Sequence, residues 1–142
     1  MTELQLDHAG LEILNPAECR ELLASTAVGR IAFIDRGEPV ILPVTIGMWE
    51  GAVVFTTAPG SKLEAAIMNR PVAIEVDDWD AERHVGWSVL VKGMAMIVDD
   101  GREIDSLDRL SVKSWSRPEI PKAWVRIVAN EITGRRVVPI SR

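Results

Sequence analysis

The segment Gly51-Ala-Val-Val-Phe-Thr-Thr-Ala-Pro-Gly-Ser-Lys-Leu63 runs from an apolar strand through two threonines and a Pro-Gly turn into the start of a helix. At such a turn, free backbone N–H groups and the positive end of the helix dipole face outward. Thr57 and Ser61 add hydroxyl groups, and Lys62 adds a full positive charge. A lysine in the first turn of a helix opposes the dipole unless an anion lies nearby. The segment therefore favours a phosphate-binding turn.

The same segment also has a purely structural interpretation. Ser61 followed by Glu64 has the spacing of a capping box, and serine or threonine commonly precedes a helix. Both interpretations stay open on this segment alone, and Lys62 is the residue that distinguishes between them.

Length and charge limit the classes of protein to consider. The 142 residues fit one domain, residues 1–142. A net charge of −5 lacks the basic footprint of nucleic-acid binders, so we expect no nucleic-acid partner. No uncharged run approaches the roughly 20 apolar residues of a membrane span, and the first residues lack the order of a signal peptide. We therefore expect a cytoplasmic protein without membrane contact.

Cysteine and histidine are too few for a dedicated metal site. Cys19 is the single cysteine, which excludes an internal disulfide and a cysteine-based metal centre. His8 and His84 lie far apart in the sequence without ligand spacing. We expect no bound metal.

Apolar runs rich in β-branched residues are joined by turns that contain glycine or polar residues. The pattern predicts strands at 28–34, 39–46, 52–57, 71–76, 86–98, 123–128 and 135–140. It predicts helices at 16–25, at 61–69 and from Asp100 through Val112, with a polar loop at 77–84. Closure is how six or seven short strands avoid exposed edges, so we expect a closed or nearly closed antiparallel barrel. A sandwich is the main structural alternative.

Five segments of the chain, in this order, resemble the pyridoxamine 5′-phosphate oxidase-like family. These segments are Val28–Phe33, Pro39–Thr45, Phe55–Leu63, Gly86–Gly93 and Ile132–Arg136. Members of the family are split barrels that bind FMN. The resemblance therefore implies a mainly β chain with a few helices, folded as a six- to seven-stranded antiparallel split β-barrel with FMN as its cofactor.

The resemblance also implies two sets of cofactor contacts. The FMN phosphate is expected at Thr57, Ser61 and Lys62. Contacts to the flavin ring are expected from two strands, through Pro43, Val44, Thr45, Trp87, Ser88 and Val89. The first three are expected to act through backbone groups, which suits the hydrogen-bonding edge of a flavin. Packing in the barrel core is the alternative role for Trp87.

A homodimer with the cofactor at its interface is the expected assembly. A barrel of this size has little surface concave enough to enclose both a flavin ring and a substrate, whereas a groove between two barrels buries the ring from both sides. The resemblance implies the same arrangement, since members of the family form two-fold dimers in which the C-terminal strand lies near the partner's flavin. Arg135 and Arg136 are therefore additional cofactor-binding candidates.

The expected function is an FMN-dependent oxidoreductase that passes hydride through flavin N5 with a small planar substrate. The cofactor carries this chemistry, so we assign no catalytic residue. Pro43–Trp49 contains no basic residue, unlike the Arg-x-x-x-Leu-Lys strand of the longer members that oxidise pyridoxamine phosphate. The sequence therefore does not predict that particular reaction.

Two alternatives stay open. The chain is a non-catalytic flavin-binding or redox-sensing protein, or it binds a deazaflavin or haem, as other members of the superfamily do. Haem needs an axial ligand, which a chain with no tyrosine and two isolated histidines supplies poorly. A deazaflavin with a long anionic tail needs a broader basic groove than Lys62 alone provides.

Overall fold

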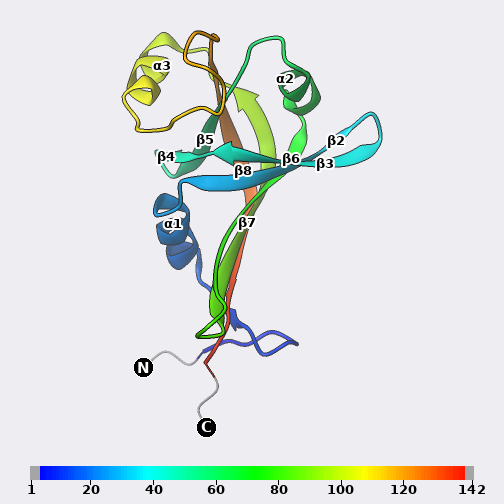
Figure 1. Cartoon of the computed structure of the whole chain (residues 1–142), viewed down its shortest axis with the longest axis vertical. Helices are drawn as coiled ribbons and strands as arrows, with labels where there is room; N and C mark the ends of the chain where they lie inside the picture. The colour runs from blue at the N-terminus through cyan, green and yellow to red at the C-terminus, as the bar shows by residue number, and fades with distance from the viewer. Residues whose placement is uncertain (1–3, 140–142) are drawn as a thin grey trace.

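A curled antiparallel β-sheet organises the computed structural model, which describes residues 4–139 (Figure 1). Its strands are β1 (Glu12–Ile13), β2 (Val28–Asp35), β3 (Glu38–Thr45), β4 (Gly47–Trp49), β5 (Ala52–Thr57), β6 (Pro71–Asp80), β7 (Val85–Ile97) and β8 (Ala123–Arg136). Within the described residues they follow the order β3-β2-β6-β7-β8-β5-β4, and β1 pairs with β8. The sheet therefore places strands from both halves of the chain side by side.

The sheet curls because the chain joins its two ends directly. A single residue, Ile46, separates β3 from β4 and is 4% exposed. Among the described residues, β3 pairs only with β2 at one end of the order, and β4 pairs only with β5 at the other. The curled sheet confirms the expected mainly β, split-barrel fold, and the sandwich alternative is wrong.

The two faces of the sheet differ in burial because side chains alternate along each strand. On the inner face, Ile31, Ile74 and Val89 are fully buried in one core cluster. On the outer face, Ile34 is 56% exposed and Ile41 is 66% exposed. The outer face therefore presents apolar side chains that this chain does not cover.

Three helices occur in the described part of the chain: α1 (Pro16–Ala24), α2 (Lys62–Ile67) and α3 (Gly101–Asp108). The start of α1 has the predicted form, since Asn15 accepts a hydrogen bond from the Glu18 N–H and Pro16 is the first helical residue. In residues 4–139, no helix has the length and hydrophobicity that crossing a bilayer requires.

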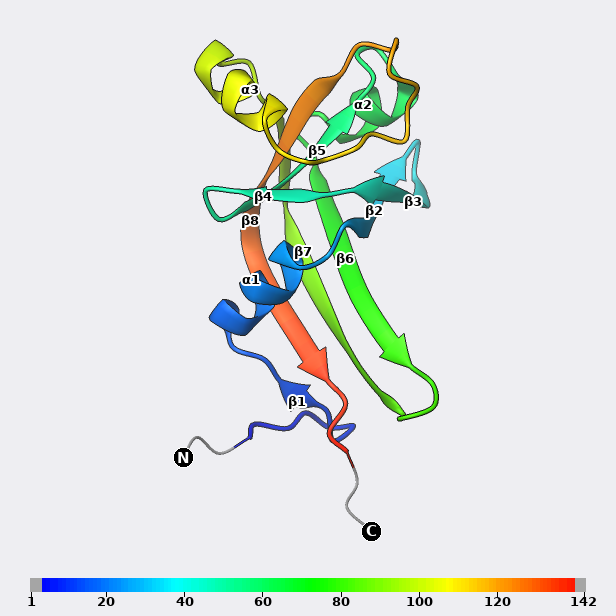
Figure 2. The ribbon, with the colours of Figure 1, turned by 60° about the vertical axis from the view of Figure 1, so that its left-hand side comes forward.

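The hairpin of β6 and β7 is longer than the sequence pattern predicted. Residues 77–80, expected in a polar loop, extend β6 and pair with residues 85–88 of β7. Figure 2 shows the two strands running together as a long arm, with β8 alongside β7. Their outward polar side chains mimic a loop in composition, although the backbone ladder continues.

Two further differences concern residues near β4 and β8. A short strand, Gly47–Trp49, forms between residues 46 and 52, where the pattern predicted no strand. The strands predicted at 123–128 and 135–140 are one continuous β8, and the prediction is wrong at 129–134 and at 137–139; residue 140 lies outside the described residues. A bulge between Lys92 and Gly93 absorbs the extra residue Asn130 opposite them. Gly93 is needed at this bulge because a Cβ there would collide with the Val128 carbonyl.

Candidate functional site

Three positively charged side chains line one pocket of about 450 Å³ beside α2. They are Lys62, Arg36 and Arg70, and the rest of the lining is Ile34, Asp35, Ala65 and Ala66. Figure 1 shows α2 above the β2–β3 hairpin at the same end of the sheet. None of the three cations takes part in an ion pair within residues 4–139. With one carboxylate against three cations, this basic pocket favours an anionic ligand.

Local backbone geometry brings the two arginines to the basic pocket. Arg36 and Gly37 form the β2–β3 turn, and their φ angles are 51° and 79°. Two-residue hairpin turns of this kind favour Asn-Gly, so an arginine at the first position carries some backbone strain. Arg70 lies three residues after the last residue of α2, and its N–H donates to the Ile67 carbonyl. The pairing of β2 with β6 holds both segments beside Lys62.

The hydroxyl groups expected at the phosphate have partners inside the turn. The Thr57 hydroxyl donates to Glu64 Oε2 at 3.3 Å, and the Gly60 N–H donates to Glu64 Oε1 at 3.1 Å. Ser61 is the N-cap of α2 and accepts from the Glu64 N–H at 3.1 Å. Thr57 is 5% exposed, whereas Lys62 is exposed. The Thr57 hydroxyl can donate to a phosphate only if it gives up its hydrogen bond to Glu64. Lys62 can contact a phosphate without breaking such a bond.

An apolar groove of about 480 Å³ lies next to the basic pocket and shares Ile34 with it. The groove is lined by residues of β2, β3, β6, β7 and β8: Ala32, Phe33, Ile34, Pro39, Val40, Ile41, Pro71, Val72, Ala73, Lys92, Gly93 and Asn130. Most of this lining is aliphatic and comes from three neighbouring strands, β3, β2 and β6. A flat apolar ring fits such a surface.

The β3 residues expected at the flavin edge lie farther along the same strand. Pro43 is opposite Arg30 in β2 and is exposed, while the Val44 side chain is 7% exposed and belongs to the core. Thr45 is half-buried at the end of β3. Backbone contacts from Pro43, Val44 and Thr45 stay a prediction, and the groove lining itself uses the earlier part of β3.

A third cavity of about 250 Å³ continues the groove and adds charged groups to it. Arg30, Glu75, Asp77 and Leu90 line it together with Ala32, Ile41 and Ala73, which it shares with the groove. Arg30 Nη1 lies 3.4 Å from Glu75 Oε1 and 3.1 Å from Asp77 Oδ2. The outer face thus carries a basic pocket at one end, an apolar groove in the middle and a mixed acidic and basic cluster at the other end.

The β7 residues expected near the ring divide between the two faces. Trp87 is half-buried and packs against the main core, as its alternative interpretation held. Val89 is fully buried, so only its backbone is available to a ligand. Ser88 is opposite Asp77 in β6 and Arg135 in β8 and therefore belongs to the outer face. Their contact with a flavin stays a prediction.

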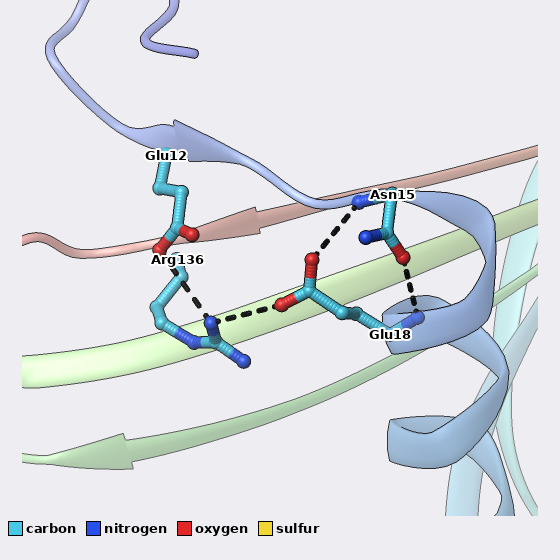
Figure 3. A network of polar contacts seen from close by, with 4 residues as sticks. All are labelled: Glu12, Asn15, Glu18 and Arg136. Atoms are coloured by element: carbon cyan, nitrogen blue, oxygen red, sulfur yellow. Dashed lines mark hydrogen bonds and ion pairs between the residues drawn. The ribbon is translucent and has the colours of Figure 1, made fainter. Parts of the chain in front are cut away.

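Arg135 and Arg136 lie at the far end of β8 from the basic pocket and bind acidic residues near the N-terminus, and Figure 3 shows the contacts of Arg136. Arg136 Nη1 lies 3.3 Å from Glu18 Oε2 and 3.5 Å from Glu12 Oε2. Arg135 Nε lies 3.1 Å from Asp7 Oδ2. Hydrogen bonds from the Leu11 and Ala9 N–H groups, with Arg135 beside it, hold the pKa of Asp7 below its usual value. Within one chain, both arginines are already paired with carboxylates.

Sequence reasoning missed five charged residues of the outer face: Arg30, Arg36, Arg70, Glu75 and Asp77. Glu75 and Asp77 share a face only because β6 continues past residue 76, into the segment that was predicted to be a polar loop. Nothing in the sequence indicated that β2 pairs with β6, which brings Arg30 to Glu75 and Arg36 toward Arg70. These contacts are non-local and depend on strand order.

The fold is a split β-barrel whose outer face carries a basic pocket beside an apolar groove. Residues 15–136 match the family described as pyridoxamine 5′-phosphate oxidase. The chain belongs to the pyridoxamine 5′-phosphate oxidase-like family, as its five segments indicated.

Similar proteins are known from Mycobacterium and Mesorhizobium species. The uncharacterized protein Rv0080 of Mycobacterium tuberculosis is 34% identical over 137 residues, which cover 91% of this chain and 87% of that protein. The FAD binding protein from Mycobacterium smegmatis superposes with a TM-score of 0.77 at 37% identity, covering 89% of this chain and 99% of that one. An FAD-binding protein from Mesorhizobium loti superposes with a TM-score of 0.75 at 26% identity, covering 90% and 99% of the two chains.

Proposed function

We propose that this chain is a flavin-dependent oxidoreductase that binds FMN and acts on a small planar substrate. The observation that carries the proposal is the basic pocket of Lys62, Arg36 and Arg70, which adjoins an apolar groove on an uncovered sheet face. A flavin nucleotide has the same two parts, an anionic phosphate and a flat apolar ring.

The basic pocket fits a phosphate group by charge and by availability. Its three cations are exposed and form no ion pair in the described residues, so an incoming anion does not have to displace a carboxylate partner from them. Charge-assisted hydrogen bonds from lysine and arginine to phosphate are among the stronger polar interactions in proteins. The Thr57 and Ser61 hydroxyl groups are expected to contact the phosphate as well, once the Glu64 carboxylate moves out of the α2 turn.

The apolar groove fits the ring, with Ala32, Ile41 and Ala73 as its floor. The free edge of β3 has no strand partner among the described residues, so its backbone groups are available to the polar edge of a flavin. When bound, the flavin supplies hydride transfer through N5. The chain's own residues bind the phosphate, orient the ring and exclude water from one of its faces.

A homodimer completes this arrangement. The groove is open to solvent, and the outer face around it exposes Val28, Ile34 and Ile41 by 47%, 56% and 66%. Contiguous exposed apolar surface of this kind marks interaction sites. A second copy that covers the outer face would bury the other side of the ring and form a substrate site between the two barrels. A cytoplasmic location stays the expectation from the sequence.

FAD is the second candidate ligand. Two arginines flank Lys62 in the basic pocket, which is more positive charge than one phosphate monoester needs. The FAD binding protein from Mycobacterium smegmatis, at 37% identity, also favours a diphosphate ligand. A flavin-binding protein without dedicated turnover has the same ligand requirements, and it differs only in the absence of a reducible substrate.

The test is flavin retention by purified protein and by two matched variants. FMN, FAD, a deazaflavin and haem are each added, unbound ligand is removed, and the absorbance spectrum is recorded before and after reduction with dithionite and re-exposure to air. Retained flavin that bleaches and recovers is expected for the wild-type protein. Lys62→Ala should retain less flavin, whereas Lys122→Ala, which removes an exposed lysine of a loop, should behave like wild type. If Lys62→Ala retained as much flavin as Lys122→Ala, Lys62 would not be part of the flavin site.

A further inference from the structure

The cavity at the end of the apolar groove holds two carboxyl groups and one guanidinium. Glu75 and Asp77 are two residues apart on β6, so their side chains leave the same face of the strand. A single nitrogen, Arg30 Nη1, lies within 3.4 Å of both carboxylates. One cation therefore faces two acids, and full ionisation of both acids leaves an unbalanced negative charge in a half-buried place.

A shared proton relieves that imbalance near neutral pH. Burial raises the pKa of Glu75 to about 7, and the hydrogen bond and charge of Asp77 act in the same direction, while Arg30 lowers it. A carboxylic acid with a pKa near the working pH is suited to exchange a proton with a bound molecule.

Other charged groups on the neighbouring strands do not neutralise the pair. Leu90 of β7 lies opposite Glu75, and Ser88 lies opposite Asp77. Lys92, the nearest cation on β7, lies opposite Ala73 and forms an ion pair with Glu131 at 3.6 Å. From β2 the pair meets Arg30, whose β3 partner in the ladder is uncharged Pro43.

The cavity also lies at a suitable distance from the basic pocket. Ile34 lines the basic pocket and Arg30 lines the acidic cavity, and the two residues are four positions apart on β2. Four residues of extended strand span about 13 Å. A ligand anchored by its phosphate at Lys62 therefore has the length of the groove for its ring, and a substrate stacked beside that ring meets the carboxyl pair.

We propose that Glu75 is a catalytic residue that exchanges a proton with the substrate of the flavin reaction, and that the substrate is a planar acceptor with a polarised C=O or C=N bond. This proposal rests on the proposed function. In the reductive direction, the acceptor receives a hydride from the reduced flavin and a proton from the Glu75 carboxyl group. The acceptor thereby gains two electrons and two hydrogens, the flavin is oxidised by two electrons, and Glu75 takes a proton back from water.

The first measurement follows the carboxyl group itself in flavin-loaded protein. Carboxyl-¹³C-labelled glutamate gives each Glu side chain a resonance, and the signal lost in Glu75→Gln identifies Glu75. We expect that resonance to titrate near pH 7 in the wild type and at a lower pH in Asp77→Asn, since Asp77 no longer opposes ionisation. Titration of Glu75 below pH 5 in the wild type would overturn the proposal.

The second measurement follows proton delivery. Flavin-loaded protein is reduced under anaerobic conditions and mixed with a quinone, menadione, while flavin reoxidation is recorded at pH 6 and pH 8.5. Loss of a general acid slows such a step by roughly 10²–10⁴-fold. Glu75→Gln should therefore react about 10²-fold more slowly than wild type at pH 6, and the difference should shrink at pH 8.5, where wild-type Glu75 is ionised. Glu119→Gln, in an exposed loop, should match wild type at both pH values.

The outcomes separate this proposal from the proposed function. If wild-type protein retains no flavin, the proposed function is wrong and the role of Glu75 falls with it. If wild type and Glu75→Gln both retain flavin but react with the quinone at equal rates at pH 6, the proposed function stands and the role of Glu75 is wrong. A pH-dependent rate ratio together with unchanged flavin affinity supports both.

Discussion

Replacing Glu75 by glutamine should change how the free energy of unfolding depends on pH. The pKa of Glu75 rises from 4.5 to about 7 on folding, so the native chain holds this proton more tightly than the unfolded chain. Below pH 4.5 both states are protonated and the stability linked to this group is fully present. As the pH rises through 7, the native carboxyl group ionises beside Asp77 and that stability is lost. Glutamine has no such proton to lose.

The size of the effect follows from the shift and from the exposure of the side chain. A difference of about 2.5 pKa units corresponds to roughly 3.4 kcal/mol at 1.36 kcal/mol per unit. The Glu75 side chain is 37% exposed, and solvent screening reduces such an interaction strongly. We therefore expect the free energy of unfolding of Glu75→Gln, relative to that of the wild type, to rise by about 1 kcal/mol between pH 5 and pH 8.

Urea unfolding of flavin-free protein, followed by tryptophan fluorescence at fixed protein concentration, measures this difference. Taking wild type minus Glu75→Gln at each pH cancels the other titrating groups, and a constant slope in urea shows that the unfolded states are comparable. Asp77→Asn should give a smaller pH dependence than wild type, because it removes the neighbouring charge. A wild-type advantage that grows between pH 5 and pH 8 would refute the reasoning.

Three further predictions concern the phosphate site and the core. Lys62→Ala should raise the Kd for FMN by roughly tenfold or more, since a charge-assisted phosphate contact is worth about 1.5–3 kcal/mol, while the far-ultraviolet circular dichroism spectrum stays unchanged. Arg36→Asn should raise the free energy of unfolding by about 1 kcal/mol by relieving the positive φ of the hairpin turn, and should weaken flavin binding; loss of both stability and affinity would contradict this. Val89→Asp should prevent folding, because Val89 is fully buried and the new carboxylate has no partner; a soluble variant with native thermal unfolding would exclude that core position.

Local sequence signals were sufficient for most of the fold. Alternating and β-branched runs located β2, β3, β5 and β7 to within a few residues, and Asn15 with Pro16 located the start of α1. They failed at residues 77–80 of β6 and 129–134 of β8, where both faces are partly exposed. There the hydrophobic alternation fades, and only the non-local ladder with β7 keeps the backbone extended.

The candidate site was less accessible to sequence reasoning than the fold. Lys62 was identified because a cation in the first turn of a helix is locally unfavourable. Arg36 and Arg70 carry no comparable local signal, since arginines in turns are usually solvated. They join Lys62 only through the β2–β6 pairing, which no local pattern specifies. Arg135 and Arg136 were predicted from the family resemblance and not from a local signal. In the structure they form ion pairs with Asp7, Glu12 and Glu18 of the same chain.

The position of β8 in the sheet has a consequence for how the chain folds. Within residues 4–139, β8 is the last strand along the chain and lies between β7 and β5, and β5 pairs otherwise with the three-residue β4 alone. Until residues 123–136 have left the ribosome, β7 and β5 both present unpaired edges. Assembly of the sheet is therefore expected to wait for β8 and to be slow, and until then the edges of β5 and β7 are open to pairing with other molecules.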